Sequence, residues 1–359
     1  MSAPALDVTL DVASIARAVC NIESVSGNES ALADAIEQAL RGAPHLTVQR
    51  DGDAIVARTS LGLQRRVLIA GHIDTVPVNN NLPVVRQDRD GAEVLVGRGT
   101  VDMKSGVAVM VKLAVELTQP GVDVTWVFYD HEEVLASLNG LGRLARNLPG
   151  IFDAEFGILC EPTNGLVEGG CNGTMRVDVR ASGTRAHSAR AWKGDNAIHK
   201  LGAALSRLAE FRAETVSVDG LDYRESLSAV GVSGGVAGNV IPDEAVLSVN
   251  YRFAPSTSVA QAQAFLETFF ADFDVTVTDS APGARPGLES PIARDFVSAV
   301  GSAPAPKYGW TDVARLAEMG IPAVNFGPGD PSLAHADDEF VVVAQIVDCE
   351  RALRDWLTR

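Results

Sequence analysis

The sequence predicts an α/β protein in which a ferredoxin-like domain is inserted into a larger domain built on a mostly parallel sheet. Short apolar runs, typical of buried parallel strands, alternate with helical segments in the first and last parts of the chain. The middle part has the order strand–helix–strand–strand–helix–strand, the ferredoxin-like split motif. We therefore expect one domain over residues 1–173 and 286–359, and an inserted α+β domain over residues 174–285.

The elements of the larger domain follow from the spacing of its apolar residues. Residues 12–40 are predicted to form an amphipathic helix that breaks at Ser26-Gly27 and restarts behind a cap at Asn28 or Ser30. A buried helix is expected at residues 105–118, and buried strands are expected at residues 67–71, 122–129, 156–160 and 321–326.

The inserted domain has a different periodicity. Residues 174–182 alternate between apolar and polar, as in a strand with one exposed face. Residues 196–213 carry an apolar stripe at helical spacing. Further strands are expected at residues 227–233, 244–253 and 275–277, and a second helix at residues 257–271.

The composition favours a cytoplasmic protein with two domains. The chain has 359 residues and a formal net charge of -16, which disfavours nucleic-acid and membrane partners. The segment MSAPALDVTLDVAS has acidic residues where a signal peptide needs an apolar stretch, and no apolar run is long enough to cross a bilayer. None of the four cysteines forms a C-x-x-C pair, so we expect reduced thiols at Cys20, Cys160, Cys171 and Cys349.

Residue types that bind metals follow four of the expected strands. In an open parallel sheet, sites form at the carboxyl ends of the strands. Imidazole and carboxylate ligands suit zinc, and two ions about 3.5–4 Å apart share a bridging carboxylate. The sequence therefore predicts a dinuclear site, with candidates in His72-Ile73-Asp74, Asp102, Asp130-His131-Glu132-Glu133, Glu161 and His335.

Each of these signals has a plainer explanation by itself. A lone H-x-D is often structural, a Glu-Glu pair is usually a solvated face, and Glu161 would suit a helix cap before Pro162. Their occurrence at successive strand ends favours the metal site. His131 competes for a ligand role, but neighbouring residues at a strand end point in opposite directions, which favours a structural role. Cys160 is expected to be a small buried hydrophobe, not a nucleophile.

Together these motifs resemble the M20 group of zinc aminoacylases and peptidases, and the resemblance covers nearly the whole chain. It rests on the H-x-D, E-E and histidine motifs above together with 97–104 (GRGTVDMK), 160–163 (CEPT), 183–188 (GTRAHS) and 238–242 (GNVIP). The resemblance implies a small-molecule N-acyl amino acid substrate, whose amide bond is cut by a metal-activated water.

The resemblance implies two Zn2+ ions, with Co2+ or Mn2+ as substitutes. The implied ligands are His72 and Glu161 for one ion, Glu133 and His335 for the other, and Asp102 as the bridge. The implied general base is Glu132. Asp74 is expected to orient His72 by contacting the ring nitrogen that does not bind the metal. The resemblance also implies a cis peptide between Asp102 and Met103.

The resemblance further implies a homodimer formed through the inserted domain, which also acts as a lid. His187 of one chain is then expected at the metal site of the other. The residues expected to help bind the substrate or its oxyanion are His187, Asn239, Arg252, Thr311, Arg190 and Arg315.

Residues 168–174 and 309–330 narrow the resemblance to the branch that hydrolyses N-succinyl-L,L-2,6-diaminopimelate, in its actinobacterial form. The products would be succinate and L,L-diaminopimelate, for lysine and cell-wall precursor synthesis. The chain departs from that branch at residues 170–174, which read GCNGT in place of G-R-R-G-S, so one expected substrate arginine is missing. It also departs at Arg315, which stands one place later than expected, and at Arg190-Ala191, which replaces a Tyr-Pro.

Two alternatives stay open from the sequence. One is another N-acyl amino acid deacylase, of the acetylornithine deacetylase type, or a dipeptidase. The other is a non-catalytic metal-binding dimer with the same fold. Glu132 favours an enzyme, because metal binding alone does not need it.

Overall fold

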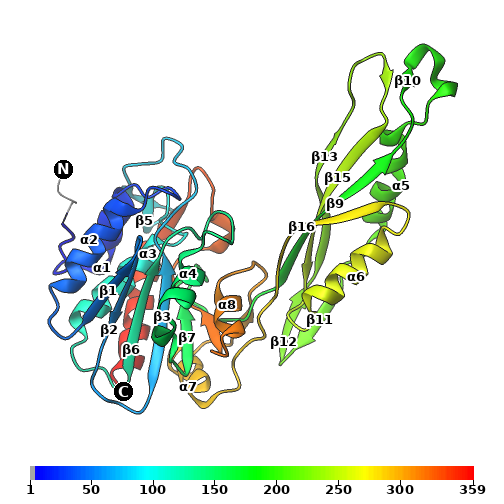
Figure 1. The fold of residues 1–359 in the computed structure, drawn as a ribbon. Helices are drawn as coiled ribbons and strands as arrows, with labels where there is room; N and C mark the ends of the chain where they lie inside the picture. Colours follow the sequence, from blue (N-terminus) through cyan, green and yellow to red (C-terminus); the bar gives the residue numbers. More distant parts are fainter. Residues whose placement is uncertain (1–4) are drawn as a thin grey trace. The chain divides into compact units, whose positions relative to one another are not determined.

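The computed structural model describes residues 5–359, which form two compact units (Figure 1). Each unit has its own buried apolar core. The first unit takes the chain up to Gly169, together with Gly287–Ala305 and Arg315–Arg359. The second unit consists of Gly170–Pro286 and Pro306–Ala314.

Residues 306–314 differ from the division expected from the sequence, which assigned them to the larger domain. In the structure they pack with the second unit. The amide of Asn172 donates to the carbonyl of Lys307 at 3.3 Å, and the Cys171 thiol lies 3.7 Å from the carbonyl of Thr311. These contacts attach the segment to the start of the inserted domain.

The first unit is built on a mixed, mostly parallel sheet. Its strands run in the order β1 (Thr47–Asp51), β2 (Ala54–Arg58), β6 (Asp123–Tyr129), β3 (Arg66–His72), β7 (Phe156–Leu159), β18 (Ala323–Asn325), β8 (Glu168–Gly169) and β17 (Ala305–Pro306). The four strands β6, β3, β7 and β18 are parallel, whereas β1, β2 and β8 pair antiparallel. All seven residues of β6 are buried, as its unbroken apolar pattern predicts for an inner parallel strand.

Helices cover this sheet and complete its core. Helix α3 (Lys104–Glu116) is buried over most of its length and packs on β3 and on α1 (Val12–Asn21), α2 (Ser30–Arg41) and α9 (Val343–Leu357). The remaining α-helices of this unit are α4 (Gly140–Asn147), α7 (Pro291–Val300) and α8 (Val313–Glu318), the last of which begins in the second unit. None of the helices in residues 5–359 is both long enough and apolar enough to span a membrane.

The first helix ends earlier than expected. Helix α1 stops at Asn21, and Ser30 is the first residue of α2, not its cap. The intervening loop is held elsewhere: Val25 forms a bridge with Thr75, and the Lys104 ammonium donates to the carbonyl of Ile22 at 2.8 Å. The loop is therefore tied to the strand end that carries His72.

A second, three-stranded sheet in the first unit was not expected from the sequence. It consists of β4 (Val85–Arg89), β5 (Ala92–Val96) and β19 (Phe340–Val342) in the order β19-β5-β4. Phe340 pairs with Val96, so the chain after His335 runs beside the chain before Asp102. Two candidate ligands distant in sequence are thereby brought near each other.

The second unit has the ferredoxin-like order that the sequence predicts. Its antiparallel sheet runs in the order β13 (Ser226–Gly234), β15 (Glu244–Phe253), β9 (Gly173–Ser182) and β16 (Asp274–Ala281), with helices α5 (Ala197–Glu210) and α6 (Val259–Phe269). Alternate residues of β9 and β15 face these helices, including Val177, Val179 and Leu247. Two short antiparallel pairings were not expected. One is the hairpin of β11 (Thr215–Val218) with β12 (Leu221–Arg224), and the other joins β10 (Ala186–His187) to β14 (Val240–Ile241).

Candidate metal centre

Three neighbouring parallel strands carry the first candidate donors at their carboxyl ends. His72 is the last residue of β3, Glu132 and Glu133 follow β6, and Glu161 follows β7. Because β6 and β7 flank β3 in the sheet, these side chains emerge at one edge.

Asp102 lies between the two histidines of the site. Its Oδ1 is 3.1 Å from Nε2 of His72, and its Oδ2 is 3.3 Å from Nε2 of His335. Nε2 of His335 is also 3.1 Å from Oε1 of Glu133, and Nε2 of His72 is 4.0 Å from Oε1 of Glu161. One oxygen of the Asp102 carboxylate thus faces His72, which lies near Glu161, and the other faces His335, which contacts Glu133.

The spacing of the donors fits two divalent ions. In each of the sets His72–Asp102–Glu161 and Asp102–Glu133–His335, the donor atoms all lie within 4.8 Å of one another. A tetrahedral zinc ion with bonds of about 2.0–2.1 Å separates its ligand atoms by roughly 3.3 Å. The arrangement can therefore hold a pair of ions that share Asp102.

The electrostatics of the site also favour positive charge. Contacts with Asp102 and Glu133 raise the pKa of His335 to about 10. Burial by itself would lower the pKa of His72, but the carboxylates of Asp102 and Asp74 raise it well above its usual value. For Asp102 the directions are reversed: burial by itself would raise the pKa of this carboxyl, but its contacts with His335 and His72 lower it. A cluster that draws protons onto its imidazoles in this way suits cations.

Asp74 supports this centre through its backbone and its side chain. The Nδ1 of His72 lies 3.1 Å from the carbonyl oxygen of Asp74 and 3.5 Å from its carboxylate. The carboxylate accepts the backbone N–H groups of Glu132 and Glu133, at 3.0 and 3.1 Å, and the hydroxyl of Ser26 at 2.6 Å. Asp74 therefore fixes the backbone that carries both glutamates, in addition to its contact with His72.

Glu132 and His131 differ in their relation to the donors. A carboxylate oxygen of Glu132 lies within 4.8 Å of donor atoms of His72 and Glu133. Nδ1 of His131 instead lies 2.8 Å from Asp130 and 3.2 Å from Glu29, and His131 belongs to none of the donor sets found in residues 5–359. The structural role that the sequence favours for His131 agrees with these contacts.

Backbone conformation at the site departs from the ordinary regions. His131 and His335 have φ angles of 58° and 65°, in the left-handed region that few residues other than glycine occupy. Such conformations persist where the surroundings enforce them, and they concentrate at functional sites. The peptide bond between Asp102 and Met103 is cis, as the resemblance implies.

Two buried residues at the centre were missed from the sequence. The carboxylate of Glu339 accepts the backbone N–H groups of Val101 and Asp102, at 2.7 and 3.2 Å. The guanidinium of Arg98 donates to Glu339 at 3.0 Å. In the sequence, Glu339 stands four residues after His335, and Arg98 stands between two glycines. These were the only signals that could have marked the two residues, and neither pattern reveals a hydrogen-bond partner.

The substrate-binding candidates of the second unit fall into two groups. His187 and Asn239 lie together, where the Asn239 carbonyl accepts the N–H of Ser188, and the exposed Arg190 follows in the same loop. Arg252 pairs with Thr174 at the other end of β9, near Thr311. The two groups are separated by most of the length of β9, roughly 26 Å at about 3.3 Å per residue.

Three further side chains that the sequence singled out have separate environments, namely Arg315, Arg252 and Cys160. Arg315 belongs to the first unit, where its guanidinium donates to the carbonyl of Ala136 at 3.4 Å. Arg252 is half-buried, and burial together with the nearby charge of Arg176 lowers its pKa. Burial raises the pKa of the Cys160 thiol, so this cysteine is poorly suited to act as a nucleophile.

Two imidazoles and several carboxylates gather at one edge of a mixed α/β sheet, and together with the family match this makes the chain a metal-dependent amidohydrolase. The sequence profile described as Peptidase family M20/M25/M40 matches residues 68–359. The chain belongs to this family.

Similarity to individual proteins extends over nearly the whole chain. A succinyl-diaminopimelate desuccinylase of Corynebacterium glutamicum is 44% identical over 366 residues, which cover 99% of this chain and 98% of the relative. A Mycobacterium tuberculosis protein provisionally assigned as succinyl-diaminopimelate desuccinylase DapE is 52% identical over 355 residues, 98% of this chain and 99% of the relative. A probable carboxypeptidase of Ajellomyces capsulatus is 29% identical, with 96% of this chain and 84% of the relative covered.

Solved structures share the fold at low sequence identity. A tripeptidase from Staphylococcus aureus matches with a TM-score of 0.77 at 20% identity, and 99% of each chain is covered. The Bacillus subtilis YXEP protein, described as a dinuclear metal-binding peptidase of the M20 family, matches with a TM-score of 0.70 at 15% identity. That match covers 97% of this chain and 96% of the other.

Proposed function

We propose that the chain hydrolyses N-succinyl-L,L-2,6-diaminopimelate to succinate and L,L-diaminopimelate. The observation that carries this proposal is the identity of 44% and 52% to the two desuccinylase relatives over almost their full lengths. The proposed location is the cytoplasm, in keeping with four buried cysteines that form no disulfide.

In this proposal two zinc ions occupy the centre, with Co2+ or Mn2+ as substitutes. His72 and Glu161 would hold one ion and Glu133 and His335 the other, with Asp102 within reach of both. Bound ions of this kind lower the pKa of water toward roughly 7 and polarise the amide carbonyl. Imidazole and carboxylate donors support the choice of zinc.

Glu132 then moves the protons of the reaction. Its carboxylate lies at the edge of the donor cluster, and the cluster retains two histidines and two further carboxylates around Asp102 without it. In the proposed mechanism Glu132 accepts a proton from the attacking water and returns it to the nitrogen of the leaving amine. The hydrogen bonds from its backbone and that of Glu133 to Asp74 hold it in position.

The proposed assembly is a homodimer with composite active sites. His187 and Arg252 would both contact one substrate in the resemblance, yet they lie at opposite ends of β9 in one chain. A small substrate does not span roughly 26 Å, so the proposal draws the two residues from different chains. The edge strand β13, with Val230 and Val232 exposed by 60% and 67%, offers a surface for pairing.

A substrate panel tests the proposed activity. Zinc-loaded protein is assayed with N-succinyl-L,L-diaminopimelate, N-acetylornithine and a set of dipeptides, and kcat/KM is compared. We expect the succinylated substrate to exceed the others by at least about 100-fold, since a site built for a charged acyl group loses that pairing with the others. Preference for a dipeptide would support the second candidate, a peptidase, which the carboxypeptidase relative favours.

A further inference from the structure

We propose that the buried pair Glu339–Arg98 is a positioning device that sets the spacing between Asp102 and His335, and so controls the affinity of the second metal position. This inference rests on the proposed two-metal centre. The second position is the one formed by Asp102, Glu133 and His335.

Glu339 is bound by the loop that carries the shared ligand. Its side chain is 1% exposed, and its Oε1 accepts the N–H groups of Val101 at 2.7 Å and Asp102 at 3.2 Å. Its Oε2 accepts the N–H of Gly99 at 3.1 Å. A carboxylate that accepts several backbone donors fixes the path of that backbone, here up to Asp102 itself.

Arg98 connects the same loop to the segment of His335. Its guanidinium is 4% exposed and donates to Glu339 at 3.0 Å. It also donates to the carbonyls of Ala336 and Pro77, each at 3.2 Å. Ala336 follows His335 directly, so the Arg98 guanidinium holds the backbone next to His335. The same guanidinium holds the Glu339 carboxylate, which orients Asp102.

The two loops are further joined through their backbones. The N–H of Gly97 donates to the carbonyl of Glu339 at 2.9 Å, and Phe340 pairs with Val96 in the small sheet. The Glu339 side chain is therefore a cross-link between two chain segments that each present a ligand. His335 itself is 52% exposed and has a left-handed backbone, so its position depends on this support.

A purely structural role makes a different prediction. Removing one partner of a buried ion pair destabilises a protein wherever the pair lies. A positioning role additionally lowers metal affinity, typically by about 10–100-fold for groups that orient ligands. The two roles are separated by a control in which a similar carboxylate is removed far from the ligands.

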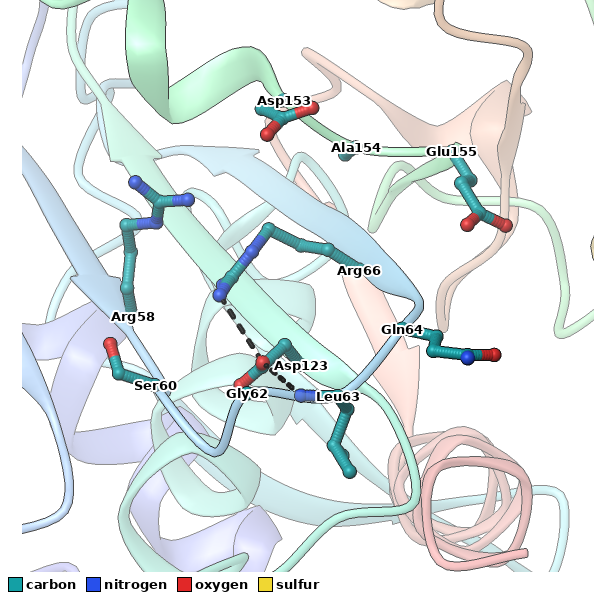
Figure 2. A pocket seen from close by; sticks show the side chains of 10 residues that line it. All are labelled: Arg58, Ser60, Gly62, Leu63, Gln64, Arg66, Asp123, Asp153, Ala154 and Glu155. Atoms are coloured by element: carbon teal, nitrogen blue, oxygen red, sulfur yellow. Dashed lines mark hydrogen bonds and ion pairs between the residues drawn. The ribbon is translucent and has the colours of Figure 1, made fainter.

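Asp123 provides that matched control at the opposite end of the sheet. Its side chain is 4% exposed and accepts the N–H groups of Leu61 and Leu63 and the hydroxyl of Thr59. Figure 2 shows it beside Arg66, in a pocket of about 520 Å3 at the amino ends of β3 and β6. Like Glu339 it is a buried carboxylate held by backbone donors next to an arginine.

The experiment is a zinc titration of metal-free protein against a chromophoric chelator, for wild type, Glu339→Gln, Glu339→Asp and Asp123→Asn. We expect Glu339→Gln to bind the second ion about 10–100-fold more weakly. The first ion should weaken clearly less, because it shares Asp102 but does not use His335. Glu339→Asp, which keeps the charge, should recover part of the loss. Asp123→Asn should lower the melting temperature but bind both ions as wild type does.

The outcomes separate the inference from the function on which it rests. The positioning role is overturned if wild type binds two ions and Glu339→Gln binds each of them as tightly as wild type does. It is also overturned if Glu339→Gln and Asp123→Asn weaken zinc binding by the same factor. If Glu339→Gln does not fold, Arg98→Lys takes its place, with the same weakening of the second ion expected and unchanged affinity counting against the inference. Wild type that binds fewer than two ions overturns the two-metal proposal itself.

Discussion

Glu132 and Glu133 are adjacent in sequence, but the proposal gives them different chemistry. We expect Glu132→Gln to keep both metal ions and to reduce kcat by at least about 100-fold, because only proton transfer is lost. Glu133→Gln, the matched variant, should instead lower metal content. Metal analysis and steady-state kinetics on both proteins provide the measurement, and near-normal kcat in Glu132→Gln would show that the base is another residue.

Asp74 offers a second test at the scale of single residues. Its carboxylate accepts the N–H groups of Glu132 and Glu133 and the hydroxyl of Ser26. Asp74→Asn replaces one acceptor oxygen with a donor, so one of those N–H groups loses its partner. We expect kcat to fall about 10–100-fold and metal affinity to fall with it. Ser26→Ala, which removes only the hydroxyl contact, should have a much smaller effect on both quantities; equal effects would contradict this account.

At the residue scale, strand-end patterns in the sequence predicted which side chains gather at the site. His72 ends β3, and Glu133 and Glu161 follow the strands on either side of it, so their positions at strand ends were enough to group them. The partners that hold the ligands could not be predicted in the same way. The contacts of Glu339 and Arg98 depend on how the 97–102 and 335–339 segments pass each other, and no local pattern encodes that crossing.

Helix α3 begins two residues after the shared ligand candidate Asp102, so its position bears on the centre. A Cβ added at Gly106 would lie 2.2 Å from the carbonyl oxygen of Cys160, next to Glu161. That oxygen belongs to the backbone and cannot rotate away. We expect Gly106→Ala to destabilise the protein by about 1–3 kcal/mol and to weaken metal binding, as the helix shifts from the end of β7.

Gly202 in α5 is the matched control for this helix. A Cβ there meets no atom within 4 Å, so Gly202→Ala should stabilise the protein by roughly 0.5–1 kcal/mol. Thermal melting of both variants, with metal content, gives the comparison. A Gly106→Ala protein that melts like wild type would show that α3 does not need its close approach to β7.

At the element scale, long periodic segments were predictable and short ones were not. The buried strands, α3 and the ferredoxin-like order were recognisable because each repeats a pattern over many residues. Strands β8, β17 and β19 have two or three residues each, too few for any period to show. The end of α1 at Asn21 was also missed, because the contacts of Val25 and Ile22 that replace the helix come from Thr75 and Lys104.

The whole molecule is proposed to work as a dimer, which a complementation experiment tests. A His187→Ala chain and a Glu132→Gln chain, each nearly inactive, are mixed and allowed to exchange subunits. If His187 acts across the dimer, a mixed dimer contains one site with both residues intact, and up to about half of the wild-type rate per mixed dimer should return.

If His187 acts within its own chain, every site in the mixed dimer remains defective. Continued inactivity after heterodimers are demonstrated would therefore exclude the shared site. Sedimentation supplies the independent control, since a monomer at assay concentration would exclude the dimer. A Val232→Lys chain should shift that equilibrium toward monomer, because it places a charge on the exposed edge strand β13.

Zinc reconstitution tests most directly whether this chain is a metal-dependent desuccinylase. Protein stripped with a chelator is titrated with zinc while succinate release from N-succinyl-L,L-diaminopimelate is measured. We expect almost no release from the stripped protein and recovery that is complete at about two zinc ions per chain. Full activity in the stripped protein, or no succinate release at any zinc level from folded protein, would contradict it.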